Sequence, residues 1–424
     1  MINFSCDIKL IGDDIPWLRA KREAGQKAFL QSGVPAAKSE NWKYTKPNRF
    51  FEHDFTYSAK GNKSLSEISV QIPFEGYCIF FENGVFNPQN SLLPQGVEVV
   101  PLIEAIMFNP KIREKIGTLT DISQHPFAAL NEAYLNEGVY LHIDSKVNLK
   151  KPVTIIYHVS SPKGDEFFNL HNLIVVDEES SAEIVEYYCC DGDIKSSYFT
   201  NVVNEIYIDR ASILKHTKLQ DDAFKSAHIA LNTVKVKQNG RYQSFCMQKG
   251  ADMARNETEV CLSEEGADTE VNAAYIMNGW ATIDTTTDIR HLVPHTTSSQ
   301  LVKGVVGGQA KGVFQGKIHI APNAVKTEGY QLHKAMLLSD DAEIDTKPEL
   351  EIFADDVKCS HGSACGELDK DQLFYMQSRG IPQEEAKHML IKAYLNDVIA
   401  KVDNEKIRDW IKLSIKDSFL NKVA

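Results

Sequence analysis

The sequence predicts a mainly β chain, in which a parallel β-solenoid lies between an N-terminal helical and mixed region and a C-terminal helical region. Short segments of alternating apolar and polar residues follow one another for more than 200 residues after Val139, almost without a helical period. Within them, a polar or glycine-rich turn followed by a small residue and a new strand recurs about every 30 residues. Helical spacing of apolar residues is concentrated near the two ends.

Residues 1–138 are expected to form the N-terminal domain. Helical spacing from Trp17 to Ser32 predicts a helix that Gly33 ends. The pair Asn83-Gly84 lies between apolar stretches and predicts a two-residue β-hairpin. Two further helices are expected over 102–116 and 127–138, with Gly138 at the end of the second.

Residues 139–365 are expected to form the solenoid. The recurring turns precede strands near six positions, with steps of 29, 30, 26, 32 and 43 residues, and the long last step leaves room for a further partial rung near 310–314. Stacked rungs of this length would bury a shared core. The six positions are Ala182, Ala211, Arg241, Ala267, Ser299 and Ala342.

A β-sandwich is the main alternative for this region. It requires hairpins and strands every 8–12 residues, whereas two-residue hairpin turns are rare here and Asn239-Gly240 is an exception. The solenoid is therefore the favoured interpretation.

Residues 366–424 are expected to form a C-terminal helical domain. Asp369 and Gln372 form a capping pair at the start of a short helix that Gly380 ends. A longer helix follows Pro382, and a last helix covers 405–420. The apolar faces expected for these two helices are Ala386, Leu390, Tyr394, Val398 and Val402 on the first, and Ile407, Ile411, Ile415 and Phe419 on the second.

Charge and cysteine content exclude several classes of protein. The 424 residues include 46 basic and 58 acidic side chains, and the net charge of −12 argues against nucleic acid or an anionic membrane as the partner. Eight cysteines without a C-x-x-C pair indicate reduced thiols. The beginning of the chain shows no signal-peptide pattern, and no stretch is apolar enough to span a membrane, so we expect a cytoplasmic protein.

The segment ADDVKCSHGSACGEL holds the densest group of soft ligands. Cys359 and His361 would point to one face of an extended strand, and thiolate with imidazole suits iron, zinc or copper(I). Cys365 follows closely, but the spacing matches no closed zinc site, and a self-contained iron–sulfur cluster needs four ligands. The chain is expected to supply part of a site; the alternative is a structural cysteine and histidine at a strand end.

Other ligand candidates have simpler explanations. His291 and His295 are four residues apart, but the segment HLVPH lacks the glutamate of a zincin motif, so both are expected to be structural. Adjacent Cys189 and Cys190 would point to opposite faces of a strand and are expected to be buried small hydrophobes.

Catalysis by the chain alone is not expected. In the glycine-rich segment 304–317, Lys311 stands where a phosphate loop needs its first glycine, and Ile318 replaces the magnesium-binding serine or threonine. No nucleophile elbow, catalytic triad or paired-carboxylate motif stands out. The sequence thus predicts a protein that is not an enzyme.

Several long segments resemble the SufB/SufD family of iron–sulfur cluster assembly proteins, and within it the SufD type. These are residues 33–45, 291–318, 337–381 and 383–395, so that the similarity extends over nearly the whole chain. The resemblance implies a right-handed parallel β-helix between helical end domains, in agreement with the solenoid.

The resemblance also implies a function. Such a chain is a non-catalytic scaffold subunit of the SUF machinery, which supports cluster formation and iron acquisition. It pairs with SufB and binds the ATPase SufC through its C-terminal helices. The functional histidine of the family's C-S-H-G motif falls on His361 and the cysteine on Cys359, at the SufB interface where a nascent iron–sulfur cluster forms.

The sequence departs from the SufB pattern at two positions. SufB-like chains have a cysteine near Ala342 and a carboxylate at Gly362. Both differences favour the SufD type, and we expect no cofactor to be held stably by this chain alone. The family's complex is linked to a flavin, but no flavin motif is present here.

Three alternatives remain at this point. The chain could be a purely structural module that transmits SufC motion while SufB holds the whole cluster. A carbohydrate-acting solenoid enzyme ranks far behind, because no carboxylates are spaced on successive rungs. When isolated, the chain could also pair with a second copy through an exposed solenoid edge.

Overall fold

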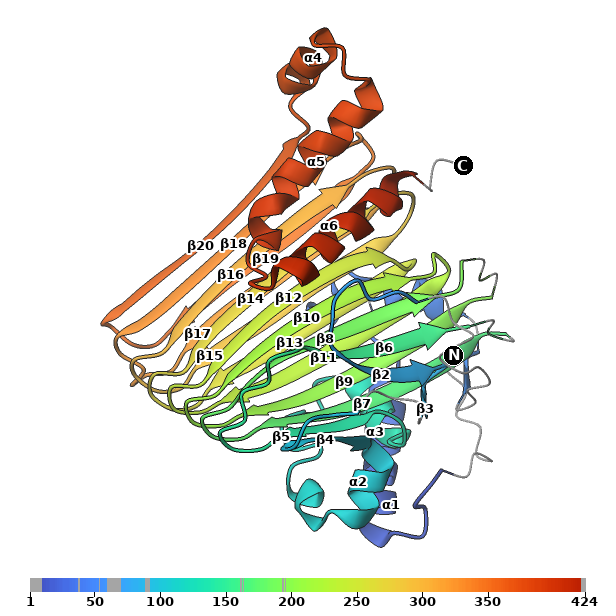
Figure 1. The fold of residues 1–424 in the computed structure, drawn as a ribbon, viewed down its shortest axis with the longest axis vertical. Coiled ribbons are helices and arrows are strands. Elements are labelled where there is room, and N and C mark those ends of the chain that lie inside the picture. Colours follow the sequence, from blue (N-terminus) through green and yellow to red (C-terminus); the bar gives the residue numbers. More distant parts are fainter. Residues whose placement is uncertain are drawn as a thin grey trace.

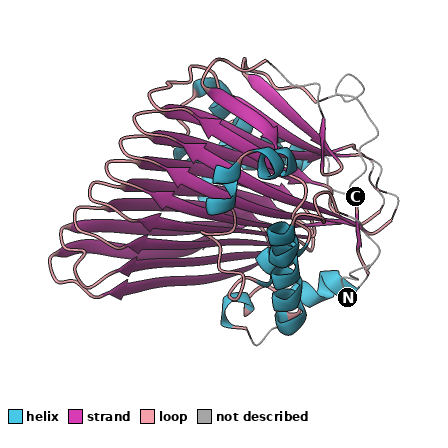
Figure 2. Cartoon of the chain, turned by 90° about the horizontal axis from the view of Figure 1, so that it is seen from below, coloured by secondary structure: helices cyan, strands magenta, loops and turns pink. Residues whose placement is uncertain are grey.

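The computed structural model describes residues 10–36, 39–52, 54–58, 70–87, 92–160, 162, 164–192, 194 and 196–420, with side chains as far as Ile415. Two ten-stranded sheets face each other and form the body of the molecule (Figures 1 and 2). Consecutive strands of the solenoid alternate between the sheets, and each pairs in parallel with the strand two positions earlier. The predicted parallel β-solenoid is confirmed and the sandwich is excluded.

The first sheet contains β1, β4 and the odd-numbered strands from β5 to β19. Its order is β19-β17-β15-β13-β11-β9-β7-β5-β4, and the two-residue strand β1 pairs with β7. The strand bounds are β1 Thr56–Tyr57, β4 Val97–Pro101, β5 Val139–Ile143, β7 Glu166–Val176, β9 Tyr198–Ile208, β11 Ser226–Val236, β13 Met253–Leu262, β15 Thr282–His291, β17 Lys311–Ile320 and β19 Glu343–Ile352.

The second sheet is built from the even-numbered strands other than β4, together with the short hairpin strand β3. Its order is β20-β18-β16-β14-β12-β10-β8-β6-β2-β3. The bounds are β2 Tyr77–Glu82, β3 Val85–Asn87, β6 Val153–Val159, β8 Ser181–Cys190, β10 Ile213–Asp222, β12 Arg241–Gly250, β14 Asp268–Met277, β16 Thr297–Val306, β18 Thr327–Leu337 and β20 Val357–Glu367.

Most of the predicted turns coincide with strand starts in the second sheet. Five of the six positions lie within two residues of the first residues of β8, β10, β12, β14 and β16. The sixth, Ala342, precedes β19 in the first sheet, and the suspected rung at 310–314 is the start of β17, also in the first sheet. The turn before Thr327, where β18 begins, was missed.

The N-terminal region contributes both helices and strands. Helix α1 covers Pro16–Ser32 and ends at Gly33, and Asn83-Gly84 joins the antiparallel strands β2 and β3, as the sequence predicts. The other elements are the 3₁₀ helices η1 Glu40–Trp42, η2 Pro47–Glu52 and η4 Pro110–Glu114, and the helices α2 Leu102–Phe108 and α3 Pro126–Ala133.

Two N-terminal helices differ from expectation. The helix expected over 102–116 is divided, because Asn109 leaves helical geometry before Pro110. Helix α3 ends at Ala133, not at Gly138. Gly138 instead has φ 135° just before β5, and a Cβ there would lie 1.8 Å from the carbonyl oxygen of His171. That glycine permits close packing of two backbones.

The C-terminal region forms three helices, α4 Lys370–Ser378, α5 Gln383–Ile399 and α6 Glu405–Leu420. The predicted cap is confirmed, since the Asp369 carboxylate accepts hydrogen bonds from the backbone N–H groups of Asp371 and Gln372. Helices α5 and α6 pack on the outer face of the second sheet through one apolar cluster. Trp410 of α6, for example, lies edge-on to Tyr187 of β8, with ring centroids 4.9 Å apart.

The buried face of α5 differs from the predicted one at two positions. Ile391 and Leu395 are buried, whereas Leu390 and Tyr394 are only partly covered. On α6 the expected Ile407, Ile411 and Ile415 are buried. The side chain of Phe419 lies outside the described residues.

Candidate functional site

The last rung of the solenoid leaves its interior open to one side. Strands β19 and β20 are the terminal strands of the two sheets and lie at the same end of the solenoid (Figure 1). At the other end the sheets finish in β4 and β3, which run antiparallel to their neighbours. The unpaired edges of β19 and β20 therefore continue the solenoid pattern and can accept further strands.

The structure places Cys359 and His361 on β20, on the side that faces the solenoid interior. Cys359 pairs in register with Gly329 of β18, and a Cβ on Gly329 would lie 3.5 Å from the Cys359 sulfur. His361 pairs with Gln331, whose side chain is buried in the interior. Cys359 is half-buried and His361 is exposed, since no later rung covers them. The shared face expected from their spacing is thus present at an accessible rim.

Ser363 and Cys365 continue the same inward face of β20. The Ser363 hydroxyl lies 3.0 Å from that of Thr346 on β19, which joins the two strands of the last rung across the interior. It also lies 3.3 Å from the Nδ1 atom of His333 on the preceding rung. Cys365 is exposed. The rim thus combines two thiols, an imidazole and a hydroxyl on one strand.

A row of polar side chains on successive strands runs from His361 into the solenoid interior. Pairing of successive strands sets His361 above Gln331 and Gln331 above Gln300. Within the part of the chain that the structure describes, three of their buried amide atoms have no hydrogen-bond partner. These are the side-chain oxygen and nitrogen of Gln331 and the side-chain nitrogen of Gln300. Buried polar atoms without partners are rare, so these amides form an unsatisfied polar patch directly beneath His361.

Burial raises the pKa of the Cys359 thiol above its usual value of 9.0, while the backbone N–H of Gly329 opposes that shift. The thiol is therefore protonated at neutral pH. Because a thiolate is the form that ligates metal, binding of iron at this rim would displace a proton from Cys359.

The weaker ligand candidates His291 and His295 lie at the end of β15 and in the turn that follows it. His291 is fully buried at the end of β15, and its ring nitrogens lie 2.8 and 2.9 Å from the hydroxyls of Thr296 and Ser298. His295 occupies a turn with φ 58°. Neither histidine belongs to a group of three potential metal ligands within the described part of the chain.

We expect His291 to make stability depend on pH. Burial lowers the pKa of His291 from 6.5 to about 4, so the unfolded chain takes up a proton at this residue before the folded chain does. The stability that the neutral His291 imidazole contributes to the folded state is fully present above pH 6.5. It decreases by about 3 kcal/mol as pH falls to 4, because the pKa of His291 differs by about 2.5 units between the unfolded and the folded chain. Urea unfolding at pH 7 and pH 4 measures this loss.

The matched variant is His291→Gln, which keeps polar atoms near both hydroxyls but does not titrate. It should lose about 3 kcal/mol less stability than wild type between the two pH values. An equal loss in both proteins would show that His291 is not held neutral in the fold.

Cys189 and the glycine-rich segment also have packing roles. Cys189 is buried against the outer residues Phe80 and Ile156, whereas Cys190 packs in a different cluster. Residues 304–317 form the end of β16, a turn and most of β17. A Cβ on Gly304 would lie 2.0 Å from the Tyr275 ring, so that glycine makes room for an interior side chain.

Sequence reasoning missed a polar network inside the solenoid. Glu186 of β8 and His216 of β10 are buried, with 3.3 Å between Glu186 Oε1 and His216 Nε2. Lys218 of β10 donates to Asn256 of β13 at 3.2 Å and lies over the Tyr188 ring. Sequence patterns contain little signal for this network, because β10 has four consecutive polar residues between two leucines and so does not show which of them face inward.

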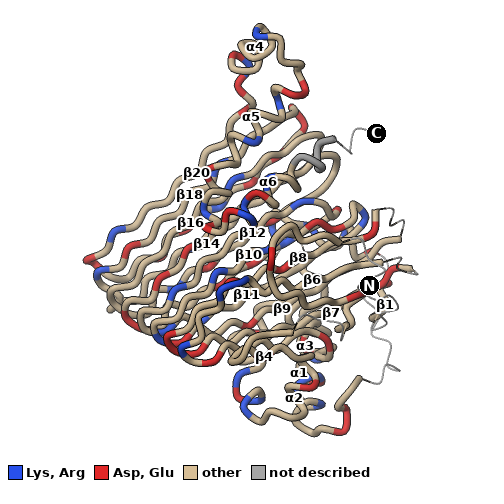
Figure 3. Tube along the Cα trace, viewed as in Figure 1, with Lys and Arg blue, Asp and Glu red and all other residues tan. Residues whose placement is uncertain are grey.

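The surface is charged with both signs. Figure 3 shows Lys, Arg, Asp and Glu intermixed along the row of turns that connects the strands. Among the described residues, no helix is long and apolar enough to cross a membrane.

Comparison with known proteins agrees with this architecture. Residues 158–394 match the family described as "SUF system FeS cluster assembly, SufBD core domain", and residues 6–155 match the "SufBD protein N-terminal region". The core match covers the solenoid from the end of β6 through β20, together with α4 and most of α5.

Three curated relatives align over most of their own length. An iron–sulfur cluster assembly SufBD family protein of Synechocystis is 29% identical over 90% of this chain and 87% of the relative. The iron–sulfur cluster assembly protein SufD of Escherichia coli is 27% identical over 90% and 89%. The chloroplastic protein ABCI7 of Arabidopsis thaliana is 28% identical over 94% and 86%. With its solenoid, its rim residues and a core match over more than half of its length, the chain belongs to the SufBD family of the SUF iron–sulfur cluster assembly system.

Proposed function

We propose that this chain is a non-catalytic scaffold subunit of a cytoplasmic SUF complex, in which it pairs with SufB and binds the ATPase SufC. In that complex His361 and Cys359 ligate or guide iron or sulfide while a cluster forms, which supports iron acquisition as well as assembly. The observation that carries the proposal is the open last rung, which presents both side chains at an unpaired edge.

Pairing with SufB is supported by the chemistry of this end of the solenoid. Edge strands with free N–H and C=O groups bind other strands by backbone hydrogen bonds. Large apolar side chains are exposed near the edge, which favours a protein partner over solvent. When SufB is absent, the same edge would pair two copies of this chain. The exposed apolar residues are Tyr330, Leu332, Ile352 and Phe353.

A shared cluster site is supported by the number of ligands at the rim. One half-buried thiol and one exposed imidazole on the same face provide two ligands. A cluster usually takes four protein ligands, so a partner strand added at β20 would have to supply the others. Cys365 faces the same side, but the resemblance assigns it no role.

The predicted domain of residues 366–424 is proposed to bind SufC. Helix α4 has no buried residue and extends beyond the last rung, as Figure 1 shows. Phe374 and Tyr375 on this helix are 72% and 59% exposed. An exposed aromatic pair on a projecting helix is a suitable anchor for a partner protein.

A structural role without metal ligation is the second candidate. Helices α5 and α6 are tied to the second sheet by polar contacts as well as apolar packing. Lys303 of β16 forms a 2.6 Å ion pair with Asp397 of α5, and Lys249 of β12 donates to the carbonyl of Ser414 in α6 at 2.9 Å. Such an attachment would transmit motion of a bound ATPase to the solenoid.

Replacing His361 by Ala distinguishes the two candidates. In the co-expressed complex, His361→Ala should leave assembly intact and lower the rate of cluster formation by about tenfold or more, as expected for a lost ligand or guide. The rate is measured from anaerobic reconstitution spectra.

The matched control is His319→Ala. His319 also lies near the open end, but on the outer face of β17, where its Nδ1 atom is 3.1 Å from Glu351. This variant should form clusters at the wild-type rate. An unchanged rate in His361→Ala would instead support the purely structural candidate.

A further inference from the structure

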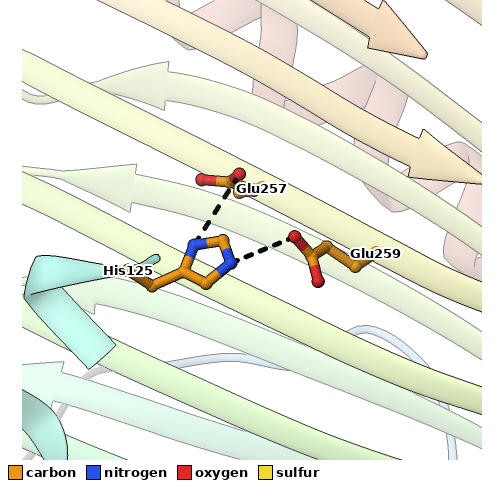
Figure 4. Close-up of side chains that lie close together, drawn as sticks. All are labelled: His125, Glu257 and Glu259. Atoms are coloured by element: carbon orange, nitrogen blue, oxygen red, sulfur yellow. Dashed lines mark ion pairs between the residues drawn. The ribbon is translucent and has the colours of Figure 1, made fainter. Parts of the chain in front are cut away.

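A second group of metal-binding side chains lies on the outer face of the first sheet, away from the rim. His125 immediately precedes α3, and Glu257 and Glu259 lie two residues apart on β13, so both glutamates point outward from the same strand. Figure 4 shows the imidazole between the two carboxylates. One potential ligand atom from each residue lies within 4.8 Å of the other two.

One of the two histidine–carboxylate distances matches that expected between ligands of a single ion. His125 Nε2 is 3.1 Å from Glu259 Oε1, and His125 Nδ1 is 3.9 Å from Glu257 Oε1. Ligands that each lie 2.0–2.2 Å from one metal ion are separated by about 3.0–3.5 Å. His125 Nε2 and Glu259 already satisfy this spacing. Glu257 lies beside the other ring nitrogen, so its carboxylate or the imidazole has to turn before all three residues share one ion.

Neighbouring groups hold Glu257 in place but leave one of its oxygens available. Arg255 donates from Nε and Nη2 to Glu257 Oε2 at 3.2 and 3.1 Å. Oε1 faces His125. In metal sites, a ligating carboxylate is commonly oriented by a hydrogen bond to one oxygen while the other oxygen binds the ion. Glu257 has this arrangement, because Arg255 binds Oε2 and leaves Oε1 available.

The three side chains line a cavity with room for further ligands. Its volume is about 360 Å³, between the first sheet and the N-terminal segments that include Asn41 and His125. Asp288, opposite Glu259 in the β-ladder, also lines it, and its Oδ1 atom is buried without a hydrogen-bond partner among the described residues. Water molecules in such a space could complete the coordination of an ion.

The cavity is lined by both acidic and basic side chains, and it is the pairing of Glu259 that favours an added cation. Arg290 is 2.7 Å from Asp288 but 3.8 Å from Glu259. The closest charged or titratable partner of Glu259 is therefore His125, at 3.1 Å. Because Arg255 already pairs with Glu257, a divalent cation would chiefly neutralise Glu259, without needing a proton on the ring.

We propose that His125, Glu257 and Glu259 bind a divalent transition-metal ion through one nitrogen and two oxygen atoms. Imidazole with carboxylates suits Zn²⁺, Fe²⁺, Co²⁺ or Mn²⁺ rather than copper(I). The ion would join α3 to β13 and so fasten the N-terminal region to the first sheet. This site is independent of the rim, since β20 belongs to the other sheet.

Titration of the full chain with Co²⁺, followed by visible absorption and calorimetry, tests the proposal. The starting protein carries Cys359→Ser, His361→Ala and Cys365→Ser, so that the rim has lost both thiols and its imidazole. It should bind one equivalent of Co²⁺, and Zn²⁺ should displace the ion. Glu259→Gln, which preserves side-chain size, should weaken binding by at least tenfold, and His125→Ala should do the same.

The matched control is Glu349→Gln, a carboxylate that lines the same cavity outside the three-residue group. It should bind Co²⁺ within twofold of the starting protein. Added Co²⁺ should also raise the unfolding temperature of the starting protein but not that of Glu259→Gln. The proposal is wrong if binding is not saturable, is unaffected by Glu259→Gln, or is present only when Cys359, His361 and Cys365 are intact. None of these outcomes bears on cluster formation at the rim.

Discussion

Replacing Asp284 by Ala is expected to lower the free energy of unfolding by about 3–5 kcal/mol. Asp284 of β15 is fully buried, and its Oδ2 atom lies 2.6 Å from Nη1 of Arg255, whose side chain is 1% exposed. The substitution leaves the buried arginine with Glu257 as its remaining carboxylate partner, and a buried charge that loses one of its two partners costs far more than the loss of a surface ion pair.

Contacts with other elements add to the expected loss. Thr45 donates a hydrogen bond to Asp284, and Gln315 of β17 donates to it at 3.4 Å. The Arg255 guanidinium lies 4.4 Å from the centre of the Trp42 ring in η1. Asp284 thus helps to connect three strands of the first sheet to the N-terminal segment, and urea unfolding followed by tryptophan fluorescence should report its loss.

A double replacement provides the control for Asp284→Ala. Changing Arg255 to Met and Asp284 to Leu together removes both charges and keeps apolar volume in their place. This protein should recover most of the stability lost in the single variant, because paired buried charges can be exchanged for packed apolar groups at little cost. A loss below about 1 kcal/mol in Asp284→Ala would contradict this expectation, because it would mean that Glu257 alone, or water, compensates the buried Arg255 charge.

The rungs could be predicted from the sequence because each repeats the same order of turn and alternating strand. The method failed at the turn before β18. There the left-handed position is occupied by Lys326, with φ 57°, and not by glycine. Glu179 and Ala211 adopt similar angles in the turns before β8 and β10, which are recognisable from their other residues, so the absence of glycine does not by itself hide a turn. The neighbouring rungs impose this conformation through backbone pairing, so the residue type alone does not reveal it.

The face of α5 shows a second limit of sequence patterns. Residues at spacing four form two adjacent lines on this helix, one with Leu390 and Tyr394 and the other with Ile391 and Leu395. Both lines are apolar. The surface of the second sheet determines which line is buried, and a helical period contains no information about that surface.

The candidate sites were predictable to different degrees. The shared face of Cys359 and His361 follows from the two-residue period of a strand. Their exposure depends on the solenoid ending at β20, which is a property of the whole stack. The contact of His125 with Glu257 joins residues far apart in the sequence, and no local pattern indicates it. Chain topology therefore creates the second site.

Replacing Phe374 by Asp is expected to weaken SufC binding by about 30-fold or more, if α4 is the anchor that we propose. Removal of a central aromatic side chain from an interface commonly costs 2 kcal/mol or more, and a buried carboxylate adds a desolvation cost. Because α4 buries no residue in this chain, the substitution should leave the unfolding temperature unchanged. Calorimetric titration of the purified chain with SufC measures the affinity.

Two comparisons show whether the effect belongs to α4. Leu92 in the N-terminal region is 94% exposed, and Leu92→Asp adds the same charge at an exposed apolar residue outside the C-terminal helices. It should bind SufC normally. Leu413 on α6 is 60% exposed, so Leu413→Asp tests whether the interface extends across the helical domain. If Phe374→Asp binds SufC normally while Leu413→Asp does not, α6 is the docking helix; if neither weakens binding, the two exposed apolar residues do not anchor SufC.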